Sequence, residues 1–282
     1  MTRKVNPSAD AAARASAELP GHAFVVPAFG EPQWLDRCLD SIQHQTIPSR
    51  VLITTSTPNA HLSAIAARRR IPLVVNAIAG GIAADWNFAL ANGDADWITL
   101  AHQDDWYETD YLESCTTAAA RTDHAILVFT DAIETRDDSA SQVLNARVKR
   151  ILAGAAFLTS QSIESTLRKR LLLSFGNPIP CPSVMLNRRA LPGFIFPDGW
   201  KSNLDWQAWF TLAGQPGAFV HVARCLVHRT LHADAETSRA LSDRAREDEK
   251  MFHAMWPAPI AATLNRLYAP SRAPYRQLRS RR

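Results

Sequence analysis

The stretch that decides the fold is Trp97-Ile-Thr-Leu-Ala-His-Gln-Asp-Asp-Trp-Tyr107. Residues 97–101 are typical of a buried strand, and this strand ends in a polar cluster with two adjacent carboxylates, Asp104 and Asp105. Because unpaired buried charge is costly, these acids must hold a cation, face a cationic group or stay solvated. Ligands of open α/β sheets bind just past the carboxyl ends of the strands, so the cluster is the first candidate site.

Strands and helices alternate on both sides of this segment. The pattern predicts strands at 23–27, 51–55, 72–76, 97–101 and 125–130, with helices at 61–70, 82–91 and 110–120 between them. A further helix is expected to have Pro32 in its first turn. Alternation of this kind predicts parallel βαβ units, whose right-handed crossovers bring the loops at Ala28, Thr55 and Gln103 to one crevice.

The second half of the chain is less regular. It predicts a polar segment at 138–149, helices at 162–174 and 203–213, strands at 181–187, 218–222 and 226–229, and a helical region at 243–267 that is interrupted near Pro257 and Pro259. Lys149, Arg150, Lys169 and Arg170 are expected to form a solvated basic face. We expect a leader at 1–20, a domain at 21–235 with halves 21–131 and 132–235, and a helical, basic tail at 236–282.

Composition limits the class of protein. With 282 residues and 46% hydrophobic content, the chain can bury one large core or two small ones. No apolar run is long enough to span a bilayer, and residues 1–20 lack the apolar stretch of a secretory signal, so a cytoplasmic protein is expected. Four separated cysteines without a Cys-x-x-Cys pair predict reduced thiols rather than a zinc site or a disulfide framework.

The basic charge is concentrated at the C-terminal end. From Lys250 onward there are seven bases and no acid, whereas the first 249 residues sum to −3. Such a tail can bind anionic lipid on the inner face of a membrane, can bind nucleic acid, or can be a solvated end. Nucleic acid is the weakest of these alternatives because the tail has no recognisable binding module and few aromatic residues.

Four segments, in order along residues 22–240, resemble an inverting glycosyltransferase of family 2 with the GT-A fold. They are Phe24-Val-Val-Pro-Ala-Phe-Gly-Glu31, Gly81-Ile-Ala-Ala-Asp-Trp-Asn87, Ala101-His-Gln-Asp-Asp105 and Asn203-Leu-Asp-Trp206. The resemblance implies a Rossmann-like α/β fold with a mostly parallel central sheet flanked by helices and a C-terminal helical extension. Thr55-Ser-Thr-Pro-Asn59, Asp85-Trp-Asn87 and His102-Gln-Asp-Asp105 also look like one bacterial subgroup of this family.

The resemblance implies a set of residues that bind a nucleotide sugar. These are Pro27, Ala28, Phe29, Glu31, Thr54, Thr55, Asp85, Asn87, His102, Gln103, Asp104 and His232. The sequence departs from the family pattern where Gly30 replaces an asparagine, where Thr54 and Thr55 replace two aspartates, and where His102 replaces the first acid of the DxD motif. The nucleobase and the role of His102 therefore stay open. Phe29 can contact the base or pack in the core, and Asp85 and Asn87 can bind ligand or cap a helix.

The family's chemistry assigns roles to the acids. Departure of a nucleoside diphosphate builds negative charge that Mg²⁺ or Mn²⁺ can neutralise while carboxylates hold the metal. The resemblance makes Asp104 the metal ligand with Asp105 in support, although both could instead cap the next helix. It makes Asp205 the catalytic base for the acceptor hydroxyl, although an acid there also suits the helix dipole.

The leading hypothesis is therefore metal-assisted transfer of a hexosyl or deoxyhexosyl group, with inversion, from a nucleotide sugar to a hydroxyl of a glycan or lipid-linked glycan in bacterial surface polysaccharide synthesis. One alternative is a catalytically inactive protein of the same fold that binds nucleotide sugars as a scaffold. Another is a nucleotidyltransferase, which is disfavoured because Ala28-Phe-Gly-Glu31 is acidic and poor in glycine.

Overall fold

The computed structural model describes residues 21–78, 80–136, 139–141, 154, 156–157, 160–232, 235 and 240–272. The expected leader at 1–20, most of the polar segment at 138–149 and residues 273–282 of the expected tail lie outside the described residues. Lys149 and Arg150 lie outside them as well.

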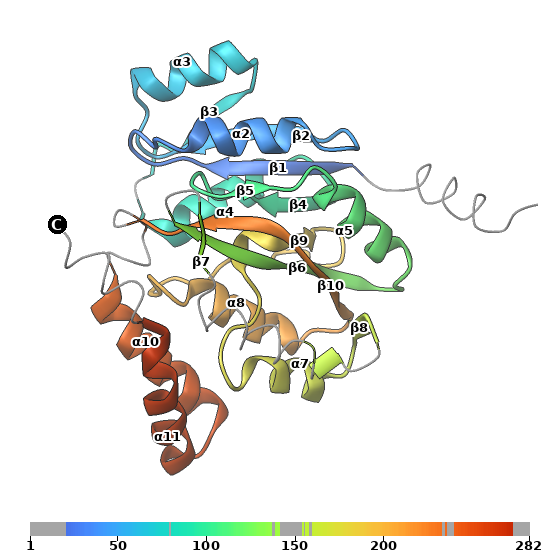
Figure 1. Ribbon diagram of the computed structural model, residues 1–282, viewed down its shortest axis with the longest axis vertical. Helices are drawn as coiled ribbons and strands as arrows, with labels where there is room; N and C mark the ends of the chain where they lie inside the picture. Colours follow the sequence, from blue (N-terminus) through green and yellow to red (C-terminus); the bar gives the residue numbers. More distant parts are fainter. Residues whose placement is uncertain are drawn as a thin grey trace, which may run out of the picture.

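The first half of the chain forms the expected alternating βα units (Figure 1). Its elements are β1 (His22–Pro27), α2 (Leu35–Gln43), β2 (Arg50–Thr55), α3 (Ala60–Arg69), β3 (Leu73–Val75), α4 (Ile82–Asn92), β4 (Trp97–Leu100), β5 (Trp106–Tyr107) and α5 (Tyr111–Ala120). Helix α2 begins at Leu35, after the N-cap Trp34, so Pro32 lies before the helix and the prediction that it stands in the first turn is wrong.

The second half combines shorter strands with the remaining helices. Its elements are β6 (Ala125–Arg136), β7 (Ser139–Ser141), β8 (Ser162–Ile163), α7 (Thr166–Leu173), η1 (Cys181–Ser183), β9 (Val184–Asn187), α8 (Leu204–Ala213), β10 (Ala218–Thr230), α10 (Leu241–Met255), α11 (Ala258–Tyr268) and η2 (Ala269–Arg272).

Four elements in this half differ from the prediction. Strand β6 extends six residues beyond the strand predicted at 125–130. The predicted helix at 162–174 begins as strand β8, because Ser162 and Ile163 pair with β10. The predicted strand at 181–187 begins as the 3₁₀ turn η1. The two strands predicted at 218–222 and 226–229 are one strand, β10, whose pairing with β6 is irregular between Val222 and Cys225.

The described strands form one sheet with the order β3-β2-β1-β4-β9-β6-β10-β5. β3, β2, β1 and β4 are parallel neighbours, and β6 pairs in parallel with β10. Antiparallel β9 joins the two groups, so that six strands of the described sheet point in one direction. The parallel strands therefore share one carboxyl edge, where their loops meet.

Both faces of the sheet are covered by helices. The alternation of β1 shows this directly, since Val25 packs into one apolar cluster with α4, α8 and α10, while Phe24 packs into another with α2, α3 and α5. All four cysteines are free thiols, and three of them are buried.

The C-terminal helices α10 and α11 pack onto the second half of the chain. Met251 and Phe252 are fully buried in the same cluster as Trp206 of α8. Figure 1 shows α10 and α11 at the lower left, beside α8. Arg272, expected to belong to a basic tail, is buried and forms an ion pair with Asp248, in which Nε and Oδ2 are 2.7 Å apart.

One predicted surface residue is buried. Lys169 of α7 is fully buried, and its Nζ donates hydrogen bonds to the carbonyl oxygens of Gln215 and Gly217 at 2.6 and 2.8 Å. The expectation of a solvated basic face is therefore wrong at this position, because the two carbonyls replace water. In the part of the chain that the structure describes, no helix is both long and apolar enough to cross a membrane.

Candidate active site

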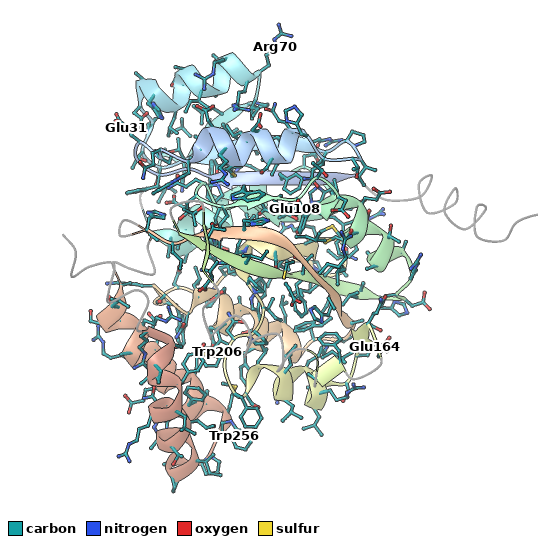
Figure 2. The ribbon with its side chains drawn as sticks, viewed as in Figure 1. Glu31, Arg70, Glu108, Glu164, Trp206 and Trp256 are labelled. Atoms are coloured by element: carbon teal, nitrogen blue, oxygen red, sulfur yellow. The ribbon has the colours of Figure 1, made fainter. Side chains whose placement is uncertain are left out.

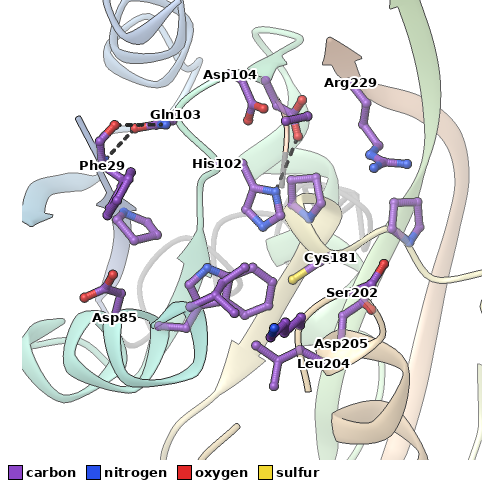
Figure 3. Close-up of a pocket in the computed structure, with 18 of the residues that line it drawn as sticks. Phe29, Asp85, His102, Gln103, Asp104, Cys181, Ser202, Leu204, Asp205 and Arg229 are labelled. Atoms are coloured by element: carbon purple, nitrogen blue, oxygen red, sulfur yellow. Dashed lines mark hydrogen bonds and ion pairs between the residues drawn. The ribbon is translucent and has the colours of Figure 1, made fainter. Parts of the chain in front are cut away.

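A cavity of about 370 Å³ lies at the carboxyl edge of the parallel strands. The loops after β1, β2, β4 and β10 line it, together with the starts of α4 and α8. Figure 3 shows Phe29 and Asp85 on one side of this cavity and Ser202 and Asp205 on the other. Residues far apart in the sequence thus face one pocket, as the crossover argument predicts.

The loop after β1 is tied to the loop after β4. Gln103 accepts a hydrogen bond from the backbone N–H of Phe29 through its Oε1 at 2.8 Å (Figure 3). Phe29 is 53% exposed, so it does not pack in the core and its ring is available to a ligand. Pro27, Thr54 and Thr55 also line the cavity, and both threonines are buried.

Asp85 is held by side chains that follow neighbouring strands. Its two carboxylate oxygens accept hydrogen bonds from Ser56 Oγ at 2.9 Å and from Asn76 Nδ2 at 3.3 Å. The N-cap of α4 is Gly81, so Asp85 is not a cap. Its carboxylate is fixed within the cavity wall.

The structure does not bring two of the predicted binding residues, Asn87 and Glu31, to the cavity. The side-chain amide of Asn87 bonds both the N–H and the carbonyl of Phe196, at 2.7 and 2.9 Å, and so ties α4 to a later loop. Glu31 is exposed on the turn after β1, at the edge of the molecule (Figure 2). Both predictions followed motif position, which does not fix the direction of a side chain.

The polar cluster after β4 is compact. His102, Asp104 and Asp105 each offer one ligand atom, and these atoms lie within 4.8 Å of one another. Asp105 is buried, and its Oδ1 accepts the backbone N–H of Thr230 at 3.0 Å. The next helix, α5, has Asp110 at its N-cap, so Asp104 and Asp105 do not cap it.

Burial sets the protonation of this cluster. It lowers the pKa of His102 to about 4, so the imidazole is neutral at pH 7. Burial also raises the pKa of Asp105 well above its usual value, and the charge of Asp104 adds to that effect. For Asp104 burial acts to raise the pKa, but the hydrogen bond from His232 and the electrostatic interactions with His102 and His232 outweigh it, so the pKa is lowered. Asp104 is therefore the ionised acid of the pair.

The donor set fits a divalent cation. His102 Nε2 is buried and has no hydrogen-bond partner among the described residues, and a neutral imidazole is the form that can bind a metal. Carboxylate oxygens suit Mg²⁺ and Mn²⁺, and a bound cation would relieve the repulsion between the adjacent acids. Asp104 and Asp105, with His102, are the residues that could hold it.

His232 reaches the cluster from the segment just after β10. Its Nε2 is 2.8 Å from Asp104 Oδ2, and its ring lies 4.0 Å from that of Trp34. The neighbouring Arg229 also lines the cavity, with Nη1 3.3 Å from Glu134 Oε1. His228 is not a lining residue, because its ring stacks on Trp106 at 3.5 Å.

Asp205 lines the same cavity from the first turn of α8. Its Oδ2 accepts a hydrogen bond from Asn177 Nδ2 at 2.9 Å, and its Oδ1 accepts the backbone N–H of Trp206 at 2.7 Å. A negative charge in the first turn of a helix also interacts favourably with the helix dipole, so the position of Asp205 suits both the pocket and helix α8.

The segment just before Asp205 is held by the C-terminal helix α10. The buried Glu247 accepts the backbone N–H groups of Lys201, Ser202 and Asn203 at 2.8, 2.9 and 2.8 Å. Asp248, fully buried, accepts the side-chain amide of Asn203 at 2.7 Å. Helix α10 therefore fixes the start of α8 and, with it, the place of Asp205.

Several lining residues were not among the predicted site residues. They are Trp86, Asn177, Cys181, Lys201, Arg229, Arg244 and Tyr268. Arg229 lies between His228 and His232, where the sequence offers a guanidinium beside two imidazoles after a predicted strand. Asn177, Arg244 and Tyr268 reach the pocket only through tertiary packing, and no local pattern marks them.

The comparisons with known proteins agree with this geometry. The model of the family described as glycosyl transferase family 2 matches residues 23–192, which is more than half of the chain. The chain belongs to this family, and the assignment supports glycosyl transfer as its activity. No curated protein sequence matches the chain.

Solved glycosyltransferase structures share the fold. Residues 1–349 of S. aureus TarS in complex with UDP-GlcNAc match with a TM-score of 0.61 and 14% identity, over 90% of this chain and 74% of that one. The mannosyltransferase PcManGT from Pyrobaculum calidifontis, in complex with GDP-Man and Mn²⁺, matches with a TM-score of 0.59 and 13% identity, over 95% of this chain and 82% of that one. The expected GT-A fold is confirmed.

Proposed function

We propose that this protein transfers a hexosyl or deoxyhexosyl group from a nucleotide sugar to a hydroxyl acceptor, with metal assistance and with inversion. The observation that carries the proposal is the pocket itself, because Asp104 and Asp205 both line it although about a hundred residues separate them. A donor diphosphate and an acceptor hydroxyl need those two kinds of group in one cavity.

The donor occupies the β1–β4 side in this proposal. Phe29 offers an exposed ring to the base, while Pro27, Ala28, Thr54, Thr55 and Asp85 form the wall around it. The similar structures in complex with UDP-GlcNAc and with GDP-Man and Mn²⁺ support a nucleotide-sugar donor and a metal. Uridine, guanosine and thymidine donors all fit this proposal, since the two threonines stand where the family has base-binding aspartates.

Asp104 and Asp105, with His102, would hold Mg²⁺ or Mn²⁺. When bound, the cation neutralises negative charge that develops on the departing diphosphate. His232 fixes the carboxylate of Asp104 through their hydrogen bond, and Arg229 adds positive charge in the cavity wall. Gln103 holds the loop that carries Phe29 against this cluster.

Asp205 acts as the general base. It removes the proton of the acceptor hydroxyl while the acceptor oxygen bonds to the anomeric carbon and the bond from that carbon to the diphosphate breaks. A single displacement of this kind inverts the anomeric centre, through an oxocarbenium-like transition state. The Asn177 amide and the Trp206 N–H orient the carboxylate.

The acceptor in this proposal is a glycan or lipid-linked glycan of a bacterial surface polysaccharide, reached from the cytoplasm. That destination rests on analogy with the family. The alternative of an inactive nucleotide-sugar-binding scaffold is favoured by one observation, the replacement of the first DxD acid by His102. It predicts tight donor binding without turnover.

The test is a transfer assay on the full chain with a panel of UDP, GDP and dTDP sugars and Mn²⁺. The Asp205→Asn variant should lower turnover by about 10³-fold, the typical contribution of a positioned base, and should still bind donor. Asp198→Asn is the matched control, since Asp198 is exposed and does not line the cavity.

Near-normal turnover by Asp205→Asn would refute its role as base. Donor binding without any turnover by the unaltered chain would favour the scaffold. The anomeric configuration of the product, read by NMR, tests inversion separately. Removal of divalent metal by a chelator should abolish turnover, and Mn²⁺ should restore it.

A further inference from the structure

Two helices of the acceptor half carry aligned apolar side chains on the outside of the molecule. On α7 and just after it, Leu167, Leu171 and Phe175 recur every four residues and are exposed, Leu167 by 76%. On α11 and just before it, Trp256, Ile260, Leu264 and Leu267 recur at helical spacing. Ile260 and Leu267 are exposed, Leu267 by 72%, whereas Trp256 and Leu264 are partly buried against the core. Each set is one stripe along a helix.

The two stripes join into one surface. The ring of Phe175 lies 5.4 Å from that of Trp256, and Trp256 Nε1 donates a hydrogen bond to the carbonyl of Ser174 at 2.8 Å. We call the seven residues Leu167, Leu171, Phe175, Trp256, Ile260, Leu264 and Leu267 the apolar ridge. Five of the nine large apolar side chains that are exposed in the described structure belong to it. Such clustering marks an interaction surface, because single exposed apolar residues are ordinary but contiguous ones are not.

The charges around the ridge indicate its partner. Helices α7 and α11 contain no acid, and each presents an exposed arginine, Arg170 or Arg266. The nearest acids in sequence are Glu164, before α7, and Glu249 on α10, which faces His253 at 4.0 Å. Residues 273–282 follow with four arginines and no acid. An apolar surface with a basic border matches an anionic lipid surface, whereas a second copy would place like charges together.

The ridge also leads to the active-site cavity. Asn177, two residues beyond Phe175, lines the cavity and bonds Asp205, and Tyr268, next to Leu267, lines it as well. Residues close in sequence to the junction of the two stripes and to Leu267 therefore reach the acceptor side of the pocket. A protein lying on a bilayer through this surface would present Asp205 to an acceptor held at the membrane.

We propose that the apolar ridge docks peripherally on an anionic membrane surface, and that the acceptor is lipid-linked. The second clause rests on the proposed function, whereas the docking itself does not. The ridge side chains enter the interfacial region, and the exposed Arg170 and Arg266 meet the headgroups.

The experiment is co-sedimentation of the full chain with vesicles of phosphatidylcholine, with and without phosphatidylglycerol. The unaltered chain should bind the anionic vesicles and release them at high salt. The double variant Leu167→Ser and Leu267→Ser should bind at least about tenfold more weakly, because two apolar side chains no longer enter the lipid.

The matched control is Val75→Ser with Ile78→Ser. Both residues are exposed and apolar, and β3 lies at the opposite end of the molecule from α11 (Figure 1). This control should bind like the unaltered chain. Thermal melts and transfer to a soluble acceptor should be unchanged in the ridge variant, so a failure of catalysis is read separately from a failure of docking.

Three outcomes would overturn the proposal: no binding to anionic vesicles, equal binding by the ridge and control variants, or binding that depends only on residues 273–282 and is lost when they are deleted. A dimer in lipid-free solution that the ridge variant dissociates would also overturn it, because the surface would then bind a second copy.

Discussion

The two sides of the pocket are built in different ways. On the donor side most lining residues lie at the end of a parallel strand or just after it, as Phe29 follows β1 and Asp104 follows β4. On the acceptor side Asp205 depends on partners far along the chain, Asn177 at 28 residues and Glu247 through the segment at 201–203. The donor side is thus set by the sheet, and the acceptor side by packing of the C-terminal helices.

The first prediction tests that dependence with the largest expected effect. Arg272→Gln leaves the fully buried Asp248 without its ionic partner, which should cost about 3–5 kcal/mol in the free energy of unfolding. Urea denaturation measures it. The exposed Arg266→Gln is the control and should change stability by less than about 0.5 kcal/mol. Equal effects of the two changes would mean that α10 and η2 are not anchored as described.

A smaller effect is expected at the link between α10 and α8. In the wild-type chain the Glu247 carboxylate accepts three backbone N–H groups. Glu247→Gln replaces one acceptor oxygen by an NH₂ donor, so the free energy of unfolding should fall by about 2 kcal/mol. Because the start of α8 shifts with it, kcat should fall more than donor KM rises. Glu249→Gln on the exposed face of α10 is the control. An unchanged kcat would show that Asp205 is placed without help from α10.

The stability of the donor side should depend on pH through His22, a buried residue of strand β1. Burial lowers the pKa of His22 to about 3, while its ring nitrogens contact Ser49 Oγ and Thr99 Oγ1 at 2.7 and 3.1 Å. The unfolded chain takes up this proton near pH 6.5 and the folded chain does not. The free energy of unfolding is therefore unaffected by His22 above pH 6.5. It falls as the pH drops from 6.5 towards 3, by about 2 kcal/mol at pH 5.

Urea midpoints of the unaltered chain and of His22→Gln across pH 5 to 7 measure this slope. Between pH 7 and pH 5 the free energy of unfolding of His22→Gln should fall by about 2 kcal/mol less than that of the unaltered chain. His61→Gln, at an exposed position, should keep the pH dependence of the unaltered chain. Parallel curves for the unaltered chain and His22→Gln would show that the buried imidazole does not control the acid sensitivity of the donor side.

The smallest effect is expected where the two donor loops meet. Gln103→Ala removes the acceptor of the Phe29 N–H, a bond worth about 1 kcal/mol, so donor KM should rise about fivefold with little change in kcat. Gln33→Ala, an exposed neighbour of the first loop, is the control. A fall in kcat without a change in KM would place Gln103 in the chemical step instead.

The contrast between the donor side and the acceptor side also explains which parts of the fold and of the site could be predicted from the sequence. Period-two and helical patterns predicted β1 to β4 and their loops, and the strand-end rule brought Phe29, Thr55 and Asp104 together. The same patterns divided β10 in two, because its irregular pairing near Cys225 interrupts the alternation. Asp205 was found by resemblance, but Asn177 and Glu247 were not, because their roles arise only when α7, α8 and α10 pack together.

The most direct test of the account is calorimetric titration of the nucleoside diphosphate that binds the unaltered chain, with Mn²⁺ present, into the Asp104→Asn and Asp205→Asn variants. We expect Asp104→Asn to weaken binding by at least about 10-fold, the lower end of the loss seen even for residues that only support a metal ligand, and Asp205→Asn to leave it within about twofold. Equal affinities in the two variants, or a greater loss in Asp205→Asn, would contradict the division of the pocket into a donor side and an acceptor side.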